Sequence, residues 1–371
     1  MQHSGVQLQL ADGSRIRVFA KLALMLADES ALHATWLNKG SSGIKLCICC
    51  KNIMDPSHVL RHGIPEDDYF RAFNRIYRYE ALDLITKEEI FEIIDDLKTL
   101  YGTMNPTNWE MYEKVAGFSH NTHSLLNNEM LRRVLDPPNQ NLVDPGHAIL
   151  SGVFPVEMEL LMKELRPFNL DYETLGEFAD LFTWPRRIQS KGITGVDALN
   201  PRRAKSSRTA HVFKSSQSEA LSIYPVVRYW LVTVVRDIPT LAAPVYSFLC
   251  LCDVMDLVFL SGRGLSTADD IRSAVETYLE ASAAAHGEDS MIPKHHYLLH
   301  LYKTMLQIGW LPCCMVLERK HKGVKKWTEP VHNLRAVDHA VLRDLANESL
   351  HNLQHAEYLR LGTGLIKARA P

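Results

Sequence analysis

Two cysteines and two histidines near the N-terminus have the residue types and spacing of metal ligands. Cys47 and Cys50 are three positions apart, and His58 and His62 are four positions apart in the run HVLRH. Two thiolates and two imidazoles suit a tetrahedral zinc ion, although the seven residues between Cys50 and His58 are fewer than a zinc finger uses. Zinc at Cys47 and Cys50, with His58 and His62 as candidate partners, is therefore one interpretation of these residues. The alternative is a small apolar cysteine cluster.

A second pair, Asp144 and His147 in the run DPGH, could act in either of two ways. An Asp three residues ahead of a His can orient the imidazole ring or share a metal ion with it. The same spacing is typical of a helix start, with Asp144 as the N-terminal cap and Pro145 at the first helical position. From spacing alone, the cap is the favoured interpretation.

A third group of histidines lies in the run PKHHYLLH, at His295, His296 and His300. His296 and His300 are four residues apart and would share one face of a helix. The acid that a zinc protease places between two such histidines is missing, because the intervening residues are Tyr, Leu and Leu. The pattern favours a packed helix whose histidines make ordinary hydrogen bonds.

The run MVLERKHKGVKKW, residues 315–327, surrounds one acid with basic side chains. Glu318 and Lys322 form an i,i+4 pair in the stabilising order, so spacing alone favours a solvated helix face. The alternative is an acid that holds a metal ion beside a phosphate, because a dense group of cations also suits phosphate contact. The basic residues available for such contact are Arg319, Lys320, His321, Lys322, Lys325 and Lys326.

The elements that must position these residues change character along the chain. A hairpin is predicted from the alternation in VQLQL and RIRVF on either side of an Asp-Gly turn. The apolar run at residues 19–28 favours a buried strand ending at Asp28, with a helix as the alternative. Open α/β sheets place ligand-binding groups at such a strand end. From residue 65 onward the spacing is mostly helical, and Thr86 with Glu89 predicts a capping box.

The composition is that of an ordinary globular protein. Hydrophobic residues make up 46% and charged residues 23% of the chain, and the formal net charge is −2. Overall charge therefore gives no support to nucleic-acid binding, and any basic contact must be local. The seven cysteines are odd in number and clustered, which indicates a reducing intracellular compartment. The most apolar stretch, residues 241–260, contains Asp253 and Asp256, so we expect a buried helix and no membrane contact.

Taken in order, these motifs resemble the transposases of the Kyakuja–Dileera–Zisupton group and their CACTA-like relatives. The series runs from the apolar segment ending at Asp28 through CICC, VDPGH, SEALSIYPVVRYW and PKHHYLLH to LERKHKGVKKW. The resemblance implies an α/β fold, in which an RNase H-like core is interrupted by a large, mostly α-helical insertion. It assigns residues 1–50 to the first part of the core, 51–290 to the insertion, and 291–371 to helices that complete the core.

The resemblance also implies roles for individual residues. Asp28 matches the family's second metal-binding acid and Glu318 its third, which implies Mg²⁺ and in-line phosphoryl transfer on DNA. The basic residues that follow Glu318 would contact DNA phosphates, and the protein would act in the nucleus. Further signatures of the family, DxxH and CxxC, match at Asp144, His147, Cys47 and Cys50.

The first acid of the family is missing, which changes the expected activity. Only 27 residues precede Asp28, and Asp12 lies in the hairpin turn. With two of three acids, we expect weak binding of two metal ions and no transposase activity from this chain alone. We therefore expect an N-terminally truncated, transposase-derived core with DNA as its partner and self-association left open. The alternatives are a non-catalytic DNA- or protein-binding module and an unrelated helical interaction protein.

Overall fold

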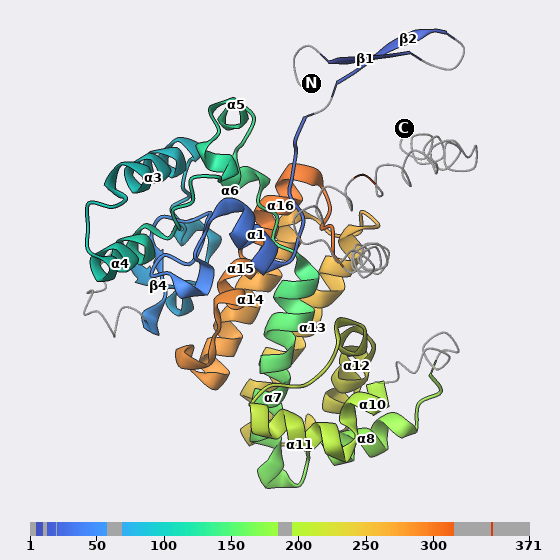
Figure 1. The fold of residues 1–371 in the computed structure, drawn as a ribbon. Helices are drawn as coiled ribbons and strands as arrows, with labels where there is room; N and C mark the ends of the chain where they lie inside the picture. The colour runs from blue at the N-terminus through green and yellow to red at the C-terminus, as the bar shows by residue number, and fades with distance from the viewer. Residues whose placement is uncertain are drawn as a thin grey trace. The chain divides into compact units, whose positions relative to one another are not determined.

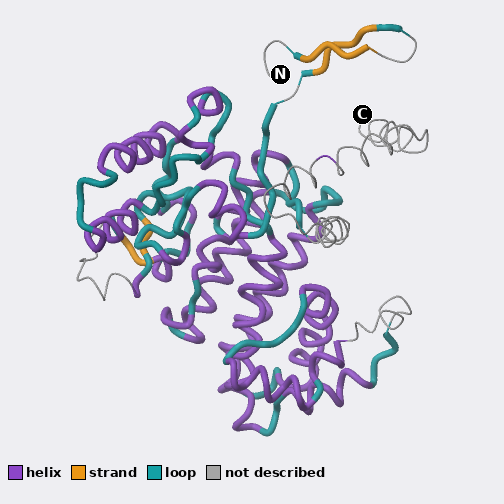
Figure 2. The backbone as a smooth tube through the Cα atoms, in the orientation of Figure 1, coloured by secondary structure: helices purple, strands orange, loops and turns teal. Residues whose placement is uncertain are grey.

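The computed structural model describes residues 5–9, 13–19, 21–57, 69–184, 195–314 and 343. Residues up to Cys314 form one compact unit, and residues 315–371 form a second. Most of the described part is helical, as Figures 1 and 2 show. This confirms the helix-rich character that the sequence predicts for the greater part of the chain.

The first described elements are the two strands of the predicted hairpin. Strand β1, Val6–Gln9, pairs antiparallel with β2, Arg15–Val18. Between them, Gly13 has a φ of +84°, a backbone conformation that glycine tolerates and other residues rarely adopt. Two further strands, β3 at Ile53–Met54 and β4 at Arg71–Ala72, form a short parallel pair.

The buried strand predicted to end at Asp28 does not form. Residues 21–28 are extended chain in which only Met25 makes a bridge, parallel to Asn141. Leu22 is 36% exposed, so the run is not the doubly covered strand that its apolar residues suggest. Among the described residues the strands form two separate two-stranded sheets, and an RNase H-like core is not confirmed.

Short helices pack around the N-terminal half of the unit. The helices are α1 (Glu29–Trp36), α3 (Lys87–Leu100), α4 (Pro106–Ala116), α5 (Glu129–Arg132) and α6 (Pro137–Gln140). The predicted capping box at the start of α3 is confirmed. The Glu89 N–H donates to Thr86 Oγ1 at 3.2 Å, and the Thr86 N–H donates to Glu89 Oε2 at 2.8 Å. Helix α3 buries Ile90, Ile94 and Leu97 on one face, as its spacing requires.

Longer helices form the centre of the unit. The π-helical segment η5 (Gly146–Val153) continues directly into α7 (Phe154–Leu165). Helix α13 (Ala242–Ser261) packs against α7 and against α14 (Ala268–His286). Large side chains on these helices are fully buried; they include Phe154, Met158, Phe248, Leu251, Tyr278 and Leu279. The hydrophobic core therefore lies where α7, α13 and α14 meet.

Helix α13 was the one stretch whose composition raised the question of a membrane. Residues 239–261 are long and apolar enough to span a bilayer, and 56% of their most apolar window is buried inside the structure. Because it packs against α7 and α14, this stretch is a core helix, as the sequence predicts.

A buried carboxylate connects these central helices. Glu157 on α7 is fully buried and accepts hydrogen bonds from Ser247 of α13, from Tyr278 Oη at 3.1 Å and from Ser282 Oγ at 3.2 Å. His286 Nε2 lies 3.3 Å from Glu157 Oε1. Burial alone would raise the pKa of Glu157, but His286 and the hydroxyl donors hold it below its ordinary value.

The remaining elements complete the unit (Figure 1). The helices are α8 (Tyr172–Asp180), α10 (Gly195–Leu199), α11 (Pro201–Ala210), α12 (Gln217–Trp230), the π-helical η7 (Leu231–Val235), α15 (Pro293–Leu298) and α16 (His300–Ile308). Short 3-10 turns are η1 (Gly40–Ser42), η2 (Phe73–Arg75), η3 (Tyr79–Ala81), η4 (Leu125–Asn127), η6 (Arg166–Phe168), η8 (Pro239–Leu241) and η9 (Glu288–Ser290). Helix α15 packs against η5, and α16 contacts α14.

Candidate metal centre

The two cysteines of the CxxC motif lie in an irregular loop that backbone hydrogen bonds hold in place. The Ile85 N–H donates to the Cys49 carbonyl at 3.1 Å, and the Lys51 N–H donates to the Asp83 carbonyl at 2.8 Å. Within the loop, the Cys49 N–H donates to Cys47 Sγ at 3.3 Å. Cys47 and Cys50 are 7% and 1% exposed, so both thiols point into the protein.

The histidines that face this loop come from the other end of the unit. His296 lies on α15 and His300 begins α16, and the four-residue interval places both rings on the same side. Their exposed fractions are 1% and 3%. The Tyr297 hydroxyl donates to the Leu46 carbonyl at 3.3 Å, which connects this helical segment directly to the cysteine loop.

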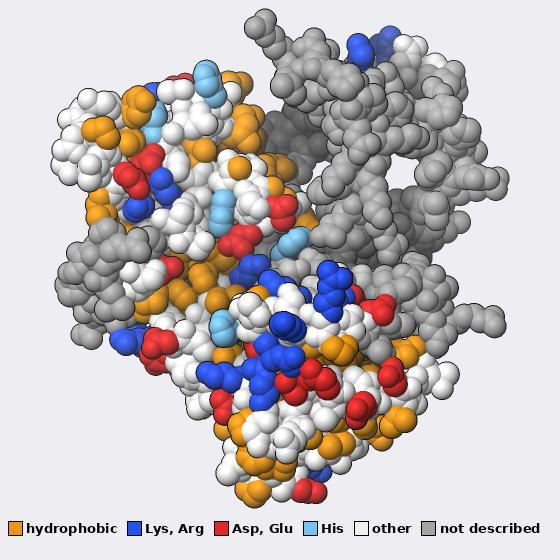
Figure 3. Space-filling model, turned by 60° about the horizontal axis from the view of Figure 1, so that its bottom comes forward, with side chains coloured by type: hydrophobic (Ala, Val, Ile, Leu, Met, Phe, Trp, Pro, Cys, Tyr) orange, Lys and Arg blue, Asp and Glu red, His pale blue; other side chains and the backbone are white. Residues whose placement is uncertain are grey.

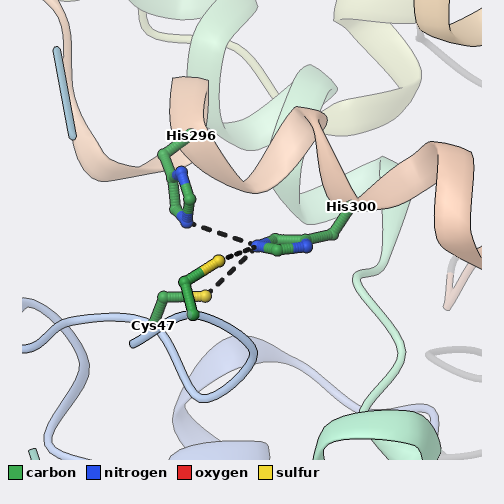
Figure 4. A group of neighbouring side chains, drawn as sticks. Cys47, His296 and His300 are labelled. Atoms are coloured by element: carbon green, nitrogen blue, oxygen red, sulfur yellow. Dashed lines mark hydrogen bonds between the residues drawn. The ribbon is translucent and has the colours of Figure 1, made fainter. Parts of the chain in front are cut away.

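The four side chains converge on one point (Figure 4). His300 Nε2 lies 3.2 Å from Cys47 Sγ, 3.4 Å from Cys50 Sγ and 3.3 Å from His296 Nε2. All four ligand atoms lie within 4.8 Å of one another. A tetrahedral Zn²⁺, with bonds of about 2.3 Å to sulfur and about 2.0 Å to nitrogen, separates its ligand atoms by about 3.3–3.8 Å. This Cys₂His₂ cluster has the donor atoms and spacing to bind a metal ion such as zinc.

Burial sets the protonation of the four groups when no cation is bound. It raises the pKa of Cys47 well above its ordinary value and also raises the pKa of Cys50. It lowers the pKa of His296 to about 3, and that of His300 well below its ordinary value. All four groups are thus neutral near pH 7, and a bound cation would convert the thiols to thiolates.

Among the described residues, the two imidazole rings make hydrogen-bond contacts through Nε2 and not through Nδ1. Nδ1 of His296 and Nδ1 of His300 are both buried, and neither has a hydrogen-bond partner among the described residues. Metal-binding histidines usually donate this second nitrogen to a carbonyl or carboxylate. The rings of His296 and His300 instead lie edge to face, with an angle of 88° between their planes. On the same helix as His300, Lys303 Nζ donates to the Pro138 carbonyl at 3.0 Å.

The structure changes the ligand set that the sequence suggests. Cys47 and Cys50 do lie in a metal-type cluster, but the histidines that join them are His296 and His300. The candidate partners His58 and His62 lie outside the described residues. From spacing alone, His296 and His300 are predicted to be ordinary packed histidines. Their HxxxH spacing was a usable signal, but 250 residues separate Cys50 from His300 and nothing local connects them.

Asp144 and His147 occupy the start of η5, and both predicted roles find support. The His147 N–H donates to Asp144 Oδ2 at 3.0 Å, as in an N-terminal cap, and the His147 ring places Nδ1 2.5 Å from the same oxygen. Asp144 Oδ1 accepts from the Cys314 N–H at 2.8 Å. Burial opposes ionisation of Asp144, but these hydrogen bonds lower its pKa below the ordinary value.

The two groups border a common cavity of about 50 Å³. Its lining includes Cys47 and His300 from the Cys₂His₂ cluster, together with Asp144, His147 and Glu29. A space of this size holds a few water molecules at most. Three of the sequence motifs, CxxC, DxxH and the histidine run, therefore meet at one place inside the unit.

Asp28, the expected second acid, caps a helix. Its Oδ1 accepts from the Ala31 N–H at 2.8 Å and from Ser30 Oγ at 3.1 Å, at the start of α1. Its expected partner Glu318 lies outside the described residues, with the basic residues Arg319, Lys320, His321, Lys322, Lys325 and Lys326. Nothing in the described part of the chain supports a Mg²⁺ site at Asp28.

The face of the molecule in Figure 3 is mixed in charge where its residues are described. On the face in Figure 3, Lys and Arg side chains gather beside Asp and Glu side chains and do not form a broad basic field. Several of the cations are paired: Arg203 lies 2.5 Å from Glu219, and Arg208 lies 2.8 Å from Asp171. The predicted contact with DNA phosphates thus depends on the basic run after Glu318.

Comparison of this chain with protein-family models, curated proteins and solved structures finds no match. The transposase resemblance is therefore supported only by the order and spacing of the motifs. The Cys₂His₂ cluster, in contrast, is supported by interatomic distances and burial.

Proposed function

We propose that Cys47, Cys50, His296 and His300 hold a structural Zn²⁺ that fixes the N-terminal cysteine loop to the α15–α16 segment. The observation that carries this proposal is the convergence of Cys47 Sγ, Cys50 Sγ and His296 Nε2 at 3.2–3.4 Å from His300 Nε2, with all four atoms within 4.8 Å of one another. Two thiolates and two imidazoles complete a tetrahedral zinc shell and leave no position for a substrate. A closed, buried site of this kind stabilises a fold and does not catalyse a reaction.

The zinc would close a very long loop. Cys50 and His300 are 250 residues apart, so the ion would connect segments that fold from distant parts of the chain. Structural zinc contributes about 10–16 kcal/mol of apparent binding free energy in small domains, and that energy is available only to the folded state. The metal would thus determine whether the cysteine loop, which has no helix or strand of its own, stays attached to the helical core.

The test is the metal content and stability of the purified full chain and two matched variants. Cys47→Ser removes a ligand, whereas Cys49→Ser replaces a buried thiol of the same loop that is not one of the four converging atoms. We expect Cys47→Ser to lose one equivalent of zinc and at least about 3 kcal/mol of stability, while Cys49→Ser retains the metal. Full zinc content in Cys47→Ser would overturn the proposal.

A second candidate function is DNA binding by a transposase-derived core that is inactive alone and acts in the nucleus. It is supported by the ordered motifs and by the meeting of three of them at one cavity, which Ala27 and Glu29, the neighbours of Asp28, also line. Metal binding by Glu318 and phosphate contact by the basic residues after it are part of this proposal. Mg²⁺ would be needed only for phosphoryl transfer.

DNA binding is tested by measuring affinity at several salt concentrations. If the basic run contacts phosphates, replacing Lys325 and Lys326 with Gln should weaken binding to every DNA sequence and reduce the salt slope by up to about 2. Salt-independent binding, or no binding, would contradict the proposal. Mg²⁺-dependent nicking of DNA by the full chain, abolished by Glu318→Ala, would show that the core is active after all.

A further inference from the structure

A second group of metal-type side chains lies at the start of η5, separate from the Cys₂His₂ cluster. Asp144, His147 and Cys314 each offer one ligand atom, and these three atoms lie within 4.8 Å of one another. Asp144 and Cys314 are each 5% exposed, and the His147 side chain is 25% exposed. The group brings together positions 170 residues apart, so helix capping at the start of η5 does not by itself explain it.

Hydrogen bonds to Asp144 hold the His147 ring and the Cys314 backbone in place. Asp144 Oδ1 accepts a hydrogen bond from the Cys314 N–H at 2.8 Å, and Asp144 Oδ2 accepts one from the His147 N–H at 3.0 Å. The His147 ring lies against the same Oδ2, with Nδ1 at 2.5 Å. The carboxylate thus fixes the His147 ring and the backbone that carries Cys314, which is the kind of preorganisation that metal sites require.

An independent feature points to a ligand at this place. Gln217, the first residue of α12, is 9% exposed, and its Oε1 is buried without a hydrogen-bond partner among the described residues. A Cβ atom built on Gly146 would lie 2.8 Å from this oxygen, 3.3 Å from Asp144 Oδ2 and 2.7 Å from Cys313 Sγ. Because a buried acceptor without a donor is costly, a bound cation or its coordinated water would satisfy it.

We propose that Asp144, His147 and Cys314 bind a second divalent transition-metal ion, of the kind that accepts mixed oxygen, nitrogen and sulfur donors. A thiolate donor excludes Mg²⁺ and Ca²⁺ and favours zinc or its close neighbours. Three protein ligands leave one position open for water, as in sites that act on a ligand and unlike the closed Cys₂His₂ cluster. The adjacent cavity of about 50 Å³, which Asp144 and His147 line, has room for that water.

The proposal is tested by counting metal ions on the purified full chain and on single variants, with Zn²⁺ and Co²⁺ as probes. The wild type should bind two equivalents. Cys314→Ser should bind one and lose part of the thiolate-to-cobalt absorption, while its helix content stays unchanged. Cys252→Ser, which replaces a buried thiol of α13 away from both groups, should keep two equivalents. If Cys314→Ser does not fold, His147→Gln serves as the second variant, with the same loss of one equivalent expected.

The outcomes for the two sites can be distinguished. If the wild type binds one equivalent that Cys47→Ser abolishes and Cys314→Ser keeps, the second site is refuted and the structural zinc stands. If that one equivalent is lost in Cys314→Ser and kept in Cys47→Ser, the structural zinc is refuted and the second site stands. Two equivalents in both Cys314→Ser and His147→Gln would also overturn the second site.

Discussion

Gly146 shows how closely the residues at the DxxH motif are packed. A side chain at this position would meet Cys313 Sγ and Gln217 Oε1, both nearer than 3.0 Å, and the oxygen belongs to a buried side chain. The glycine is thus needed for space and not for an unusual backbone angle.

A Gly146→Ala substitution should therefore be destabilising. We expect a loss of about 1–3 kcal/mol, because the added methyl group forces Cys313, Gln217 or η5 itself to move. Chemical denaturation of the variant measures the change. Gly262→Ala is the control, since a Cβ there meets nothing within 4 Å, and it should change stability by less than about 0.5 kcal/mol. Equal stability of Gly146→Ala and the wild type would contradict the packing described here.

At the scale of elements, a charged side chain joins helices α11 and α12. Helix α12 begins at a capping box in which the Ser216 N–H donates to Glu219 Oε2 at 2.7 Å. The same carboxylate binds Arg203 of α11 through two contacts, at 2.5 and 2.9 Å. These interactions lower the pKa of Glu219 to about 2, with the hydrogen bond from Arg203 as the largest cause. One residue thus caps α12 and connects it to α11.

The sign of the resulting pH dependence follows from that lowered pKa. The folded state prefers the ionised Glu219, so its contribution is fully present above about pH 4.5 and is lost as the pH falls toward about 2. We expect Glu219→Gln to lower stability by about 1–2 kcal/mol at pH 7. The difference in stability between the wild type and Glu219→Gln should become smaller as the pH falls from about 4.5 to 2, which thermal melts at each pH would measure. A stability difference that stays constant over this pH range would show that the contact between Glu219 and Arg203 contributes nothing to stability.

At the scale of the whole molecule, the Cys₂His₂ cluster joins segments that lie far apart in the sequence. The cysteine loop is irregular, and its hydrogen bonds run to residues 83–85, to Lys114 of α4, to Pro138 of α6 and, through Tyr297, to α15. The central helices α7, α13 and α14 have their own core around Glu157 and do not need the metal to pack. Loss of the metal from the Cys₂His₂ cluster should thus destabilise the cysteine loop first and the helical core later.

Removal of the metal from the wild type should make that order visible. A strong chelator should lower the melting temperature by roughly 5–15 °C, because binding energy is lost from the folded state only. Hydrogen exchange should rise first at residues 43–50 and 296–300, while α13 and α14 stay protected. Unchanged hydrogen exchange at the cysteine loop after complete removal of zinc would contradict the proposal that zinc fixes this loop to the α15–α16 segment.

Several features follow from the sequence alone because they depend on neighbouring residues. The hairpin around Gly13, the capping box at Thr86, the cap at Asp144 and the buried helix at 241–260 are all local patterns, and the structure contains each of them. The CxxC motif likewise predicts metal ligands from spacing only. Local hydrogen bonding and side-chain periodicity determine such features without reference to the rest of the chain.

Tertiary structure alone decides which residues meet. The partners of Cys47 and Cys50 are His296 and His300, because the packing of α15 against η5 brings them to the cysteine loop. The apolar run before Asp28 has the composition of a buried strand, yet among the described residues it makes only the bridge from Met25 to Asn141 and ends in the cap of α1. Strand pairing and long-range side-chain clusters depend on partners far away in the sequence, and no spacing rule identifies them.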